Sequence, residues 1–205
     1  RMFRILQGDV GFGKNIVACI SAINSIESGY QCGLMAPTSI LAEQHFTLIN
    51  NLINQSNLKI NVKLLTGKTD LKKRKKILID LENKKIDFLI GTHALFQKTI
   101  LFKKLGLIII DEQHKFGVQQ RIKFAKKGGV NCDVLLLSAT PIPRTMMMSI
   151  YGDMDSSKLT EKPLHRQKIL TLSKPESKIN DLWPFLEKKI KNRKQIFWLC
   201  PLIED

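Results

Sequence analysis

The chain has 205 residues, of which 43% are hydrophobic and 25% charged, a composition that excludes a disordered tail and suits one substantial domain. Lysine and arginine outnumber aspartate and glutamate by 33 to 18, so the formal net charge is +15 and the isoelectric point is near 9.8. This balance excludes an acidic protein and favours a polyanionic partner, although lysines that only keep a surface soluble would give the same charge.

The cysteines give no sign of a zinc site or a disulfide framework. Cys19, Cys32, Cys132 and Cys200 are widely spaced, and none belongs to a Cys-x-x-Cys pair. We therefore expect buried, reduced thiols and a cytoplasmic protein. The longest apolar run, residues 105–110, is too short to cross a membrane, and the first residues lack the pattern of a signal peptide.

Short apolar runs alternate with longer amphipathic stretches along the chain. The runs at 3–7, 32–36, 61–65, 87–90, 105–110 and 133–137 are typical of strands buried on both faces of a parallel sheet. Helical spacing of apolar residues predicts helices over 15–28, 39–53 and 70–83, and Gly29 ends the first of them. The alternation predicts right-handed βαβ units and an α/β fold with a doubly wound, mostly parallel sheet.

The C-terminal part has a different pattern. Residues 156–168 are polar and include a proline, which predicts a linker, and residues 178–194 form a lysine-rich helix candidate. Residues 195–200, Gln-Ile-Phe-Trp-Leu-Cys, predict a new strand. Since one strand cannot complete a sheet, we expect a first domain over 1–155, a linker and connecting helix over 156–194, and the first strand of a truncated second domain over 195–205.

The clearest motif occupies residues 8–15, between a predicted strand and a predicted helix. It fits G-x-x-x-x-G-K, in which a glycine-rich backbone cradles phosphates at a helix N-terminus and the lysine reaches the β and γ phosphates. The next residue is usually Ser or Thr, whose hydroxyl binds Mg²⁺; here it is Asn15, whose amide oxygen is also a hard ligand. A purely structural glycine turn is the alternative. The predicted ATP-binding residues are Gly8, Asp9, Val10, Gly11, Phe12, Gly13, Lys14 and Asn15.

Two acids follow the predicted strand at 105–110. Ligands of parallel sheets bind at the C-terminal ends of strands, so Asp111 and Glu112 are expected on the same edge as residues 8–15. Asp111 would hold Mg²⁺ together with Asn15, Glu112 would orient and deprotonate the attacking water, and Lys14 would complete the catalytic set. Solvated acids that merely end a strand are the alternative.

Residues 8–15, Asp111-Glu112-Gln113-His114 and Ser138-Ala139-Thr140 together resemble the superfamily 2 helicases and translocases. The longer stretches at 35–45 and 200–205 are most similar to the RecG family, and the stretch at 139–145 also resembles it, so the resemblance covers nearly the whole chain. It implies a RecA-like P-loop NTPase lobe followed by the start of a second lobe. It also implies an ATP- and Mg²⁺-dependent helicase or translocase that acts on branched DNA, such as Holliday junctions and stalled forks, in recombination and repair.

The resemblance implies further residue roles. Coupling between nucleotide, DNA and the second lobe is implied for Gln113, His114, Ser138, Ala139 and Thr140. Contacts to the DNA backbone, which carry no sequence preference, are implied for Pro37, Thr38, Thr66, Gly67, Gly91, Thr92, His93 and Arg144. A helix cap at Thr38, a turn at Gly67 and a core histidine at His93 are the alternatives.

For the whole protein, the resemblance implies a monomer that binds branched or duplex DNA and no membrane. A second lobe carrying catalytic arginines and an N-terminal wedge domain would lie outside these 205 residues, so the isolated chain is expected to hydrolyse ATP poorly, if at all.

Other functions stay open. The transcription-repair coupling factor, a duplex translocase, shares the loop at 8–14 and the stretch 139–145 but usually has Glu where this chain has Gln113. A non-catalytic nucleic-acid-binding domain on a decayed P-loop would explain Asn15. A small-molecule kinase would leave residues 111–114 and 138–140 unexplained.

Overall fold

The chain folds into two compact units, Arg1–Leu164 and His165–Asp205. The computed structural model describes residues 2–97, 99–111, 132–140, 154–161, 169–173 and 175–199. The boundary between the units lies within the polar segment at 156–168 for which the sequence predicts a linker.

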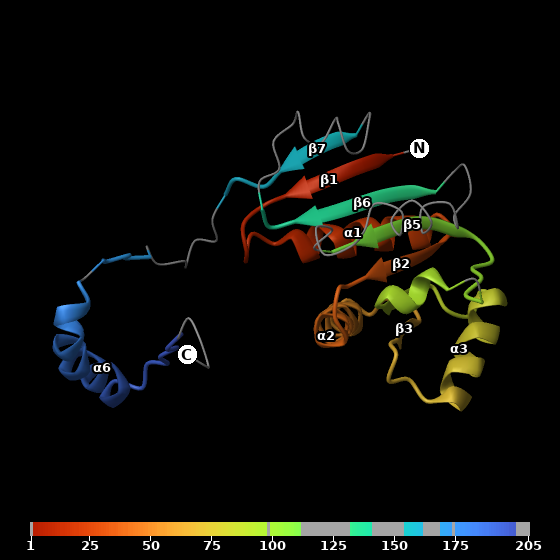
Figure 1. Ribbon diagram of the computed structural model, residues 1–205. Coiled ribbons are helices and arrows are strands. Elements are labelled where there is room, and N and C mark those ends of the chain that lie inside the picture. The colour runs from red at the N-terminus through yellow and green to blue at the C-terminus, as the bar shows by residue number, and fades with distance from the viewer. Residues whose placement is uncertain are drawn as a thin grey trace. The chain divides into compact units, whose positions relative to one another are not determined.

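A parallel sheet forms the centre of the first unit (Figure 1). Among the described residues it has seven strands in the order β3-β4-β2-β5-β6-β1-β7, and all neighbouring strands run parallel. The strands are β1 (Phe3–Gln7), β2 (Gln31–Met35), β3 (Val62–Leu65), β4 (Phe88–Gly91), β5 (Leu105–Ile110), β6 (Asp133–Ser138) and β7 (Asp155–Lys158). The six strands expected from apolar runs and the doubly wound α/β class are confirmed.

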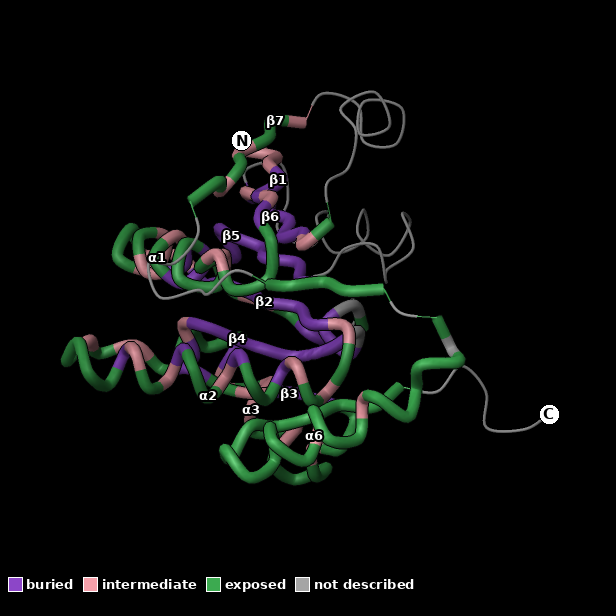
Figure 2. The backbone as a smooth tube through the Cα atoms, turned by 90° about the vertical axis from the view of Figure 1, so that its left-hand side faces the viewer, coloured by how far each residue is buried: buried purple, intermediate pink, exposed green. Residues whose placement is uncertain are grey.

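Helices cover both faces of the sheet, and the core lies in the two layers between them. The helices are α1 (Lys14–Glu27), α2 (Ser39–Gln55) and α3 (Leu71–Glu82). Ala22 of α1 and Ile49 of α2 share one buried cluster with Ile109 of β5, whereas Leu81 of α3 packs with Ile108 on the opposite face. Figure 2 shows the buried backbone running along the central strands. Strands covered on both faces explain the continuous apolar runs in the sequence.

Side chains with local hydrogen bonds determine where two of these helices begin. The hydroxyl of Thr38 accepts a bond of 3.2 Å from the backbone N–H of Leu41 at the start of α2. The carboxylate of Asp70 accepts a bond of 3.0 Å from the N–H of Lys72 at the start of α3. Such caps satisfy backbone donors that lack a partner within the helix.

Strand β7 extends the sheet beyond the predicted boundary at residue 155. Its sequence, Asp-Ser-Ser-Lys, has no apolar signal. The linker predicted from residue 156 onward is wrong for residues 156–158, because they pair with β1. An edge strand needs little apolar burial because only one neighbour pairs with it. Here Arg4 of β1 donates to Ser157 at 2.7 Å and pairs with Asp155 at 3.2 Å, which adds side-chain contacts to the backbone pairing.

A buried glutamine joins three parts of the first unit. The side-chain amide of Gln31 donates to the carbonyls of Leu81 at 2.9 Å and Ile86 at 2.8 Å, and its oxygen accepts from the N–H of Lys104 at 3.0 Å. Gln31 is fully buried, so these bonds satisfy both ends of the amide in a site without solvent. The residue holds β2, the end of α3 and the start of β5 in one arrangement.

The three described cysteines are buried, as expected. Cys19, Cys32 and Cys132 form no disulfide, and Cys200 lies outside the described residues. Burial raises the pKa of the Cys32 thiol to about 12. None of the helices in the described segments has the length and apolar character that crossing a bilayer requires.

The second unit is a short helical segment. A 3₁₀ helix at Glu176–Asp181 leads into α6 (Leu182–Lys191), and Pro184 lies in the first turn of α6, where a missing N–H does no harm. Residues 194–199 form no strand, so the strand predicted at 195–200 is wrong for the described part of that range. A strand needs a neighbour, and the described residues of this unit contain none. Instead the rings of Trp183 and Trp198 stack, with centroids 5.7 Å apart.

Candidate nucleotide-binding site

The loop between β1 and α1 is built around two left-handed glycines. Gly11 and Gly13 both have a φ of +82°, a conformation that side chains with a Cβ rarely adopt. The carbonyl of Gly13 accepts a bond of 3.0 Å from the N–H of Ile16 and so begins the helix. The N–H of Gly8 donates to the carbonyl of Ser138 at 3.2 Å, which ties the loop to the end of β6. The loop thereby leads into a helix N-terminus, which carries a partial positive charge.

Lys14 bends back over this loop. Its ammonium group donates to the carbonyls of Gly8 at 2.6 Å and Asp9 at 3.0 Å. The carboxylate of Asp9 accepts a bond of 2.7 Å from the N–H of Val10 and so stabilises the turn. A full positive charge therefore lies within the loop, beside the helix N-terminus, which is the arrangement that binds phosphate.

Asp111 follows β5 at the same edge of the sheet, and two other elements hold it. Its backbone N–H donates to the carbonyl of Met35 at the end of β2, at 2.9 Å. Its carboxylate Oδ2 lies 2.8 Å from Nε2 of His45, which belongs to α2. Asp111 is 8% exposed and His45 is 5% exposed, so this side-chain contact is sheltered from water.

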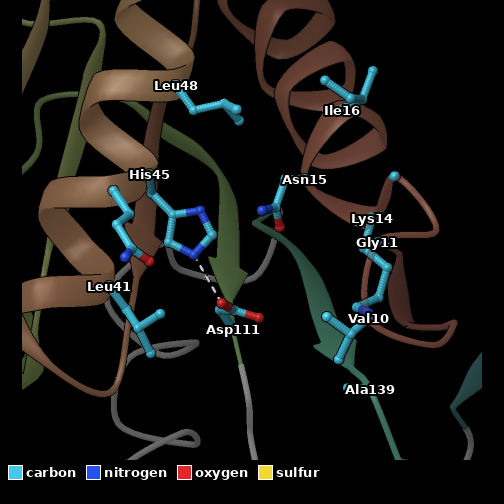
Figure 3. A pocket seen from close by; sticks show the side chains of 12 residues that line it. Val10, Gly11, Lys14, Asn15, Ile16, Leu41, His45, Leu48, Asp111 and Ala139 are labelled. Carbon is cyan, nitrogen blue, oxygen red and sulfur yellow. Dashed lines mark hydrogen bonds and ion pairs between the residues drawn. The ribbon is translucent and has the colours of Figure 1, made fainter. Parts of the chain in front are cut away.

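The loop and Asp111 border one cleft of about 500 Å³ between α1 and α2 (Figure 3). Figure 3 shows Asn15, His45 and Asp111 pointing into the same space. The expectation that the loop and the acidic strand end share one edge is confirmed. The residues that line the cleft are Val10, Gly11, Gly13, Lys14, Asn15, Ile16, Leu41, Gln44, His45, Leu48, Asp111 and Ala139.

The oxygen atoms that line the cleft suit a magnesium ion that is also bound by the phosphates of a nucleotide. Asn15 and Asp111 supply an amide and a carboxylate oxygen. Within the described ranges no three His, Cys, Asp or Glu side chains converge on a metal site. Magnesium in nucleotide sites is commonly held by one or two protein oxygens together with phosphate oxygens and water, so the residues present fit that ion.

The predicted coupling segment begins beside the phosphate loop. Ser138 is fully buried at the end of β6, and its hydroxyl donates to the carbonyl of Thr140 at 2.9 Å. Ala139 lines the cleft, and the carbonyl of Ser138 holds Gly8. Four predicted site residues lie outside the described part of the chain: Glu112, Gln113, His114 and Arg144.

The residues predicted to contact DNA follow three neighbouring strands. Strands β2, β4 and β3 lie side by side, and Gly91 pairs in register with both Met35 and Leu65. The three loops therefore leave the sheet at the same edge. The predicted residues on them are Pro37 and Thr38 after β2, Thr66 and Gly67 after β3, and Gly91, Thr92 and His93 at the end of β4.

Some of these residues also have local structural roles. Thr38 caps α2, as its alternative interpretation holds, and the N–H of Thr66 donates to the hydroxyl of Thr69 at 3.0 Å within a turn. A Cβ at Gly91 would collide with the carbonyl oxygen of Leu65, so only glycine fits there. Thr92 is 4% exposed, and its hydroxyl has no hydrogen-bond partner among the described residues.

His45 is the site residue that sequence reasoning missed. It lies three residues after Ala42 and four before Ile49, on the buried face of α2. The sequence did carry a signal, because a histidine on the apolar face of a predicted helix is buried and needs a hydrogen-bond partner. The sequence did not indicate that the partner is Asp111.

Comparison with known proteins places this geometry in a family. The model of the DEAD/DEAH box helicase family matches residues 3–149. The ATP-dependent DNA helicase RecG of Bacillus subtilis is 46% identical over the whole chain, which covers 30% of that protein. RecG of Thermotoga maritima is 44% identical, with 26% of its length covered. The chain thus spans less than a third of the curated relatives it matches.

Comparison with solved structures also finds helicases. The structure of RecG bound to a three-way DNA junction has a TM-score of 0.83 and 41% identity, and covers 98% of this chain and 27% of that one. A DEAD box protein from Methanococcus jannaschii, at 21% identity, has a TM-score of 0.62 over 78% of this chain and 46% of that one, and so shares the fold. The phosphate loop, the facing Asp111 and the match over residues 3–149 together show that the chain belongs to the DEAD/DEAH box helicase family.

Proposed function

We propose that this chain is the nucleotide-binding motor lobe of an ATP-dependent DNA helicase that acts on branched DNA in recombination and repair. The observation that carries the proposal is the cleft that gathers the phosphate loop, Lys14, Asn15 and Asp111. The likeness to RecG proteins at 44–46% identity supports branched DNA as the substrate and favours this function over that of the transcription-repair coupling factor. One relative is known bound to a three-way junction.

The residues of the cleft suit phosphoryl transfer. Backbone N–H groups at the start of α1 would bind phosphate oxygens, and the Lys14 ammonium would exchange its two loop carbonyls for them. Asn15 and Asp111 would hold Mg²⁺, which neutralises charge on the phosphates when bound. Glu112, adjacent to Asp111 in the sequence, would accept the proton of the attacking water.

The loops after β2, β3 and β4 would form the DNA surface. The backbone amides of these loops and the exposed hydroxyl of Thr38 suit contacts to phosphates that carry no sequence information, whereas Thr66 and Thr92 are buried and would support the loops from behind. The net charge of +15 supports a nucleic-acid partner. Met35 at the end of β2 accepts the hydrogen bond from the N–H of Asp111, so the strand that leads into the loop at Pro37 and Thr38 also holds one side of the nucleotide cleft.

Further features of the proposal concern the whole protein. We infer a cytoplasmic monomer in which a second helicase lobe faces the cleft and a wedge domain splits the duplex. Arginines of the second lobe would complete the transition-state clamp, so residues 1–205 alone would turn over ATP weakly. Segments Ser138–Thr140 and Gln113–His114 would couple the nucleotide to that lobe.

The test is ATP hydrolysis by the full-length protein, with and without a three-way DNA junction. We expect turnover that requires Mg²⁺ and is stimulated by the junction more than by linear duplex of equal length. No turnover under any DNA condition would contradict the proposal.

A second candidate is a nucleic-acid-binding domain on a decayed ATPase, which Asn15 favours because Ser or Thr usually stands there. The substitution Asn15→Thr in the full-length protein separates the two. Under the helicase proposal it changes turnover by less than about threefold, because an amide oxygen is already a competent hard ligand. An inactive natural protein that gains turnover with threonine would establish the decayed site instead.

A further inference from the structure

We propose that His45 is a positioning residue that orients the Asp111 carboxylate for magnesium. The inference rests on the proposed function, because it takes Asp111 as the metal-binding carboxylate. His45 does not contact the nucleotide in this account; it acts through Asp111.

The contact is short, buried and directional. Nε2 of His45 and Oδ2 of Asp111 are 2.8 Å apart, and the two side chains are 5% and 12% exposed. Because a carboxylate only accepts hydrogen bonds, Nε2 of the imidazole is the donor. Water competes little at this burial, so the bond restricts rotation of the carboxylate about its last side-chain torsion.

The backbone on both sides of this contact is fixed independently. Asp111 is held to β2 through Met35, at 2.9 Å. His45 is carried by α2, whose start is capped by Thr38 and whose Ile49 is buried in the core. The backbones that carry the two side chains are therefore held by contacts other than the His45–Asp111 bond itself.

The contact also lies where a metal ligand would need support. Both side chains line the nucleotide cleft, and Figure 3 shows them beside Asn15, the other proposed ligand. Hydrogen-bond partners of metal ligands typically affect metal affinity or activity by about 10- to 100-fold when they are removed.

Three substitutions of His45 separate positioning from packing. Glutamine can place an amide N–H about as far from the backbone as Nε2, asparagine ends near the Nδ1 position, and leucine fills space without donating. Magnesium is titrated into full-length protein with the non-hydrolysable fluorescent analogue mant-AMPPNP, and analogue affinity is also measured in EDTA. Gln31→Leu is the matched control, because it removes a buried amide at the opposite end of β2.

We expect His45→Leu and His45→Asn to raise the half-saturating magnesium concentration by about 10- to 100-fold. His45→Gln should stay within about threefold of the natural protein, since it retains the donor. Metal-free analogue affinity should be unchanged in all three variants and in Gln31→Leu, whose magnesium dependence should also be normal. Should the leucine variant fail to fold, the comparison of glutamine with asparagine decides the matter.

A double substitution adds a further condition. Once Asp111→Asn is in place, His45→Leu should produce no additional change in magnesium dependence, because the two act through one contact. The inference is overturned if leucine leaves the magnesium titration unchanged, if glutamine is as impaired as leucine, or if metal-free affinity falls in parallel. A natural protein that binds no analogue at all, with or without magnesium, would instead overturn the proposed function.

Discussion

Replacement of Lys14 by alanine should weaken nucleotide binding by an amount that the structure allows us to work out. In this structure the ammonium donates two hydrogen bonds to the neutral carbonyls of Gly8 and Asp9. These bonds are already charge-assisted, because the ammonium is ionised, and hydrogen bonds of a charged group contribute about 1.5–3 kcal/mol. Only the added attraction between the ammonium and a negatively charged phosphate oxygen is gained on binding, which we take as about 1–1.5 kcal/mol per bond. Exchanging two neutral acceptors for phosphate oxygens therefore favours binding by about 2–3 kcal/mol.

Without the ammonium this gain is lost. Lys14→Ala should raise the Kd for mant-AMPPNP by about 30- to 150-fold, because each 1.4 kcal/mol corresponds to a factor of ten. Lys63→Ala is the control, since it removes an equal charge from an exposed position on β3, and its Kd should stay within about twofold because an exposed charge away from the site is screened. A Lys14 variant that binds as tightly as the natural protein would show that the loop does not cradle phosphate.

Two further predictions concern the scaffold. Gln31→Leu should reduce the free energy of unfolding by about 2–4 kcal/mol, because it leaves buried backbone groups without hydrogen-bond partners and leucine compensates for this only in part. Urea unfolding should show this loss, whereas Gln55→Leu at an exposed position should change the free energy of unfolding by less than about 0.5 kcal/mol. Equal urea midpoints for the two variants would contradict the prediction. Cys32, whose pKa burial raises from 9.0 to about 12, should resist iodoacetamide at pH 8 in the folded protein and react readily in urea. Because the folded pKa lies above the unfolded value, this thiol should disfavour the folded state only as the pH rises above 9, and rapid native labelling would show that Cys32 is accessible.

Local sequence patterns predict most of the first unit because they reflect burial on both sides of a strand. β5, Leu-Gly-Leu-Ile-Ile-Ile, is buried at every position, and such a run is readable without knowledge of its neighbours. The phosphate loop is readable for a similar reason, since its glycines meet backbone requirements within eight residues.

Local patterns did not predict the segments whose structure depends on pairing with residues far away in the sequence. β7 has a polar sequence and owes its place to pairing with β1 and to Arg4, 151 residues earlier. Residues 195–199 have the composition of a strand, yet composition alone provides no neighbour to pair with. In both cases the decisive interaction lies outside the segment itself.

The same division applies to the candidate site. The order of residues along the chain determined that a phosphate loop precedes a helix and that acids end a central strand, because these are short-range patterns with their own chemistry. Only tertiary structure decided that α2 brings His45 to Asp111 across 66 positions of sequence. The physical reason is that a buried polar side chain must find a partner, and which partner it finds depends on how helices pack on the sheet.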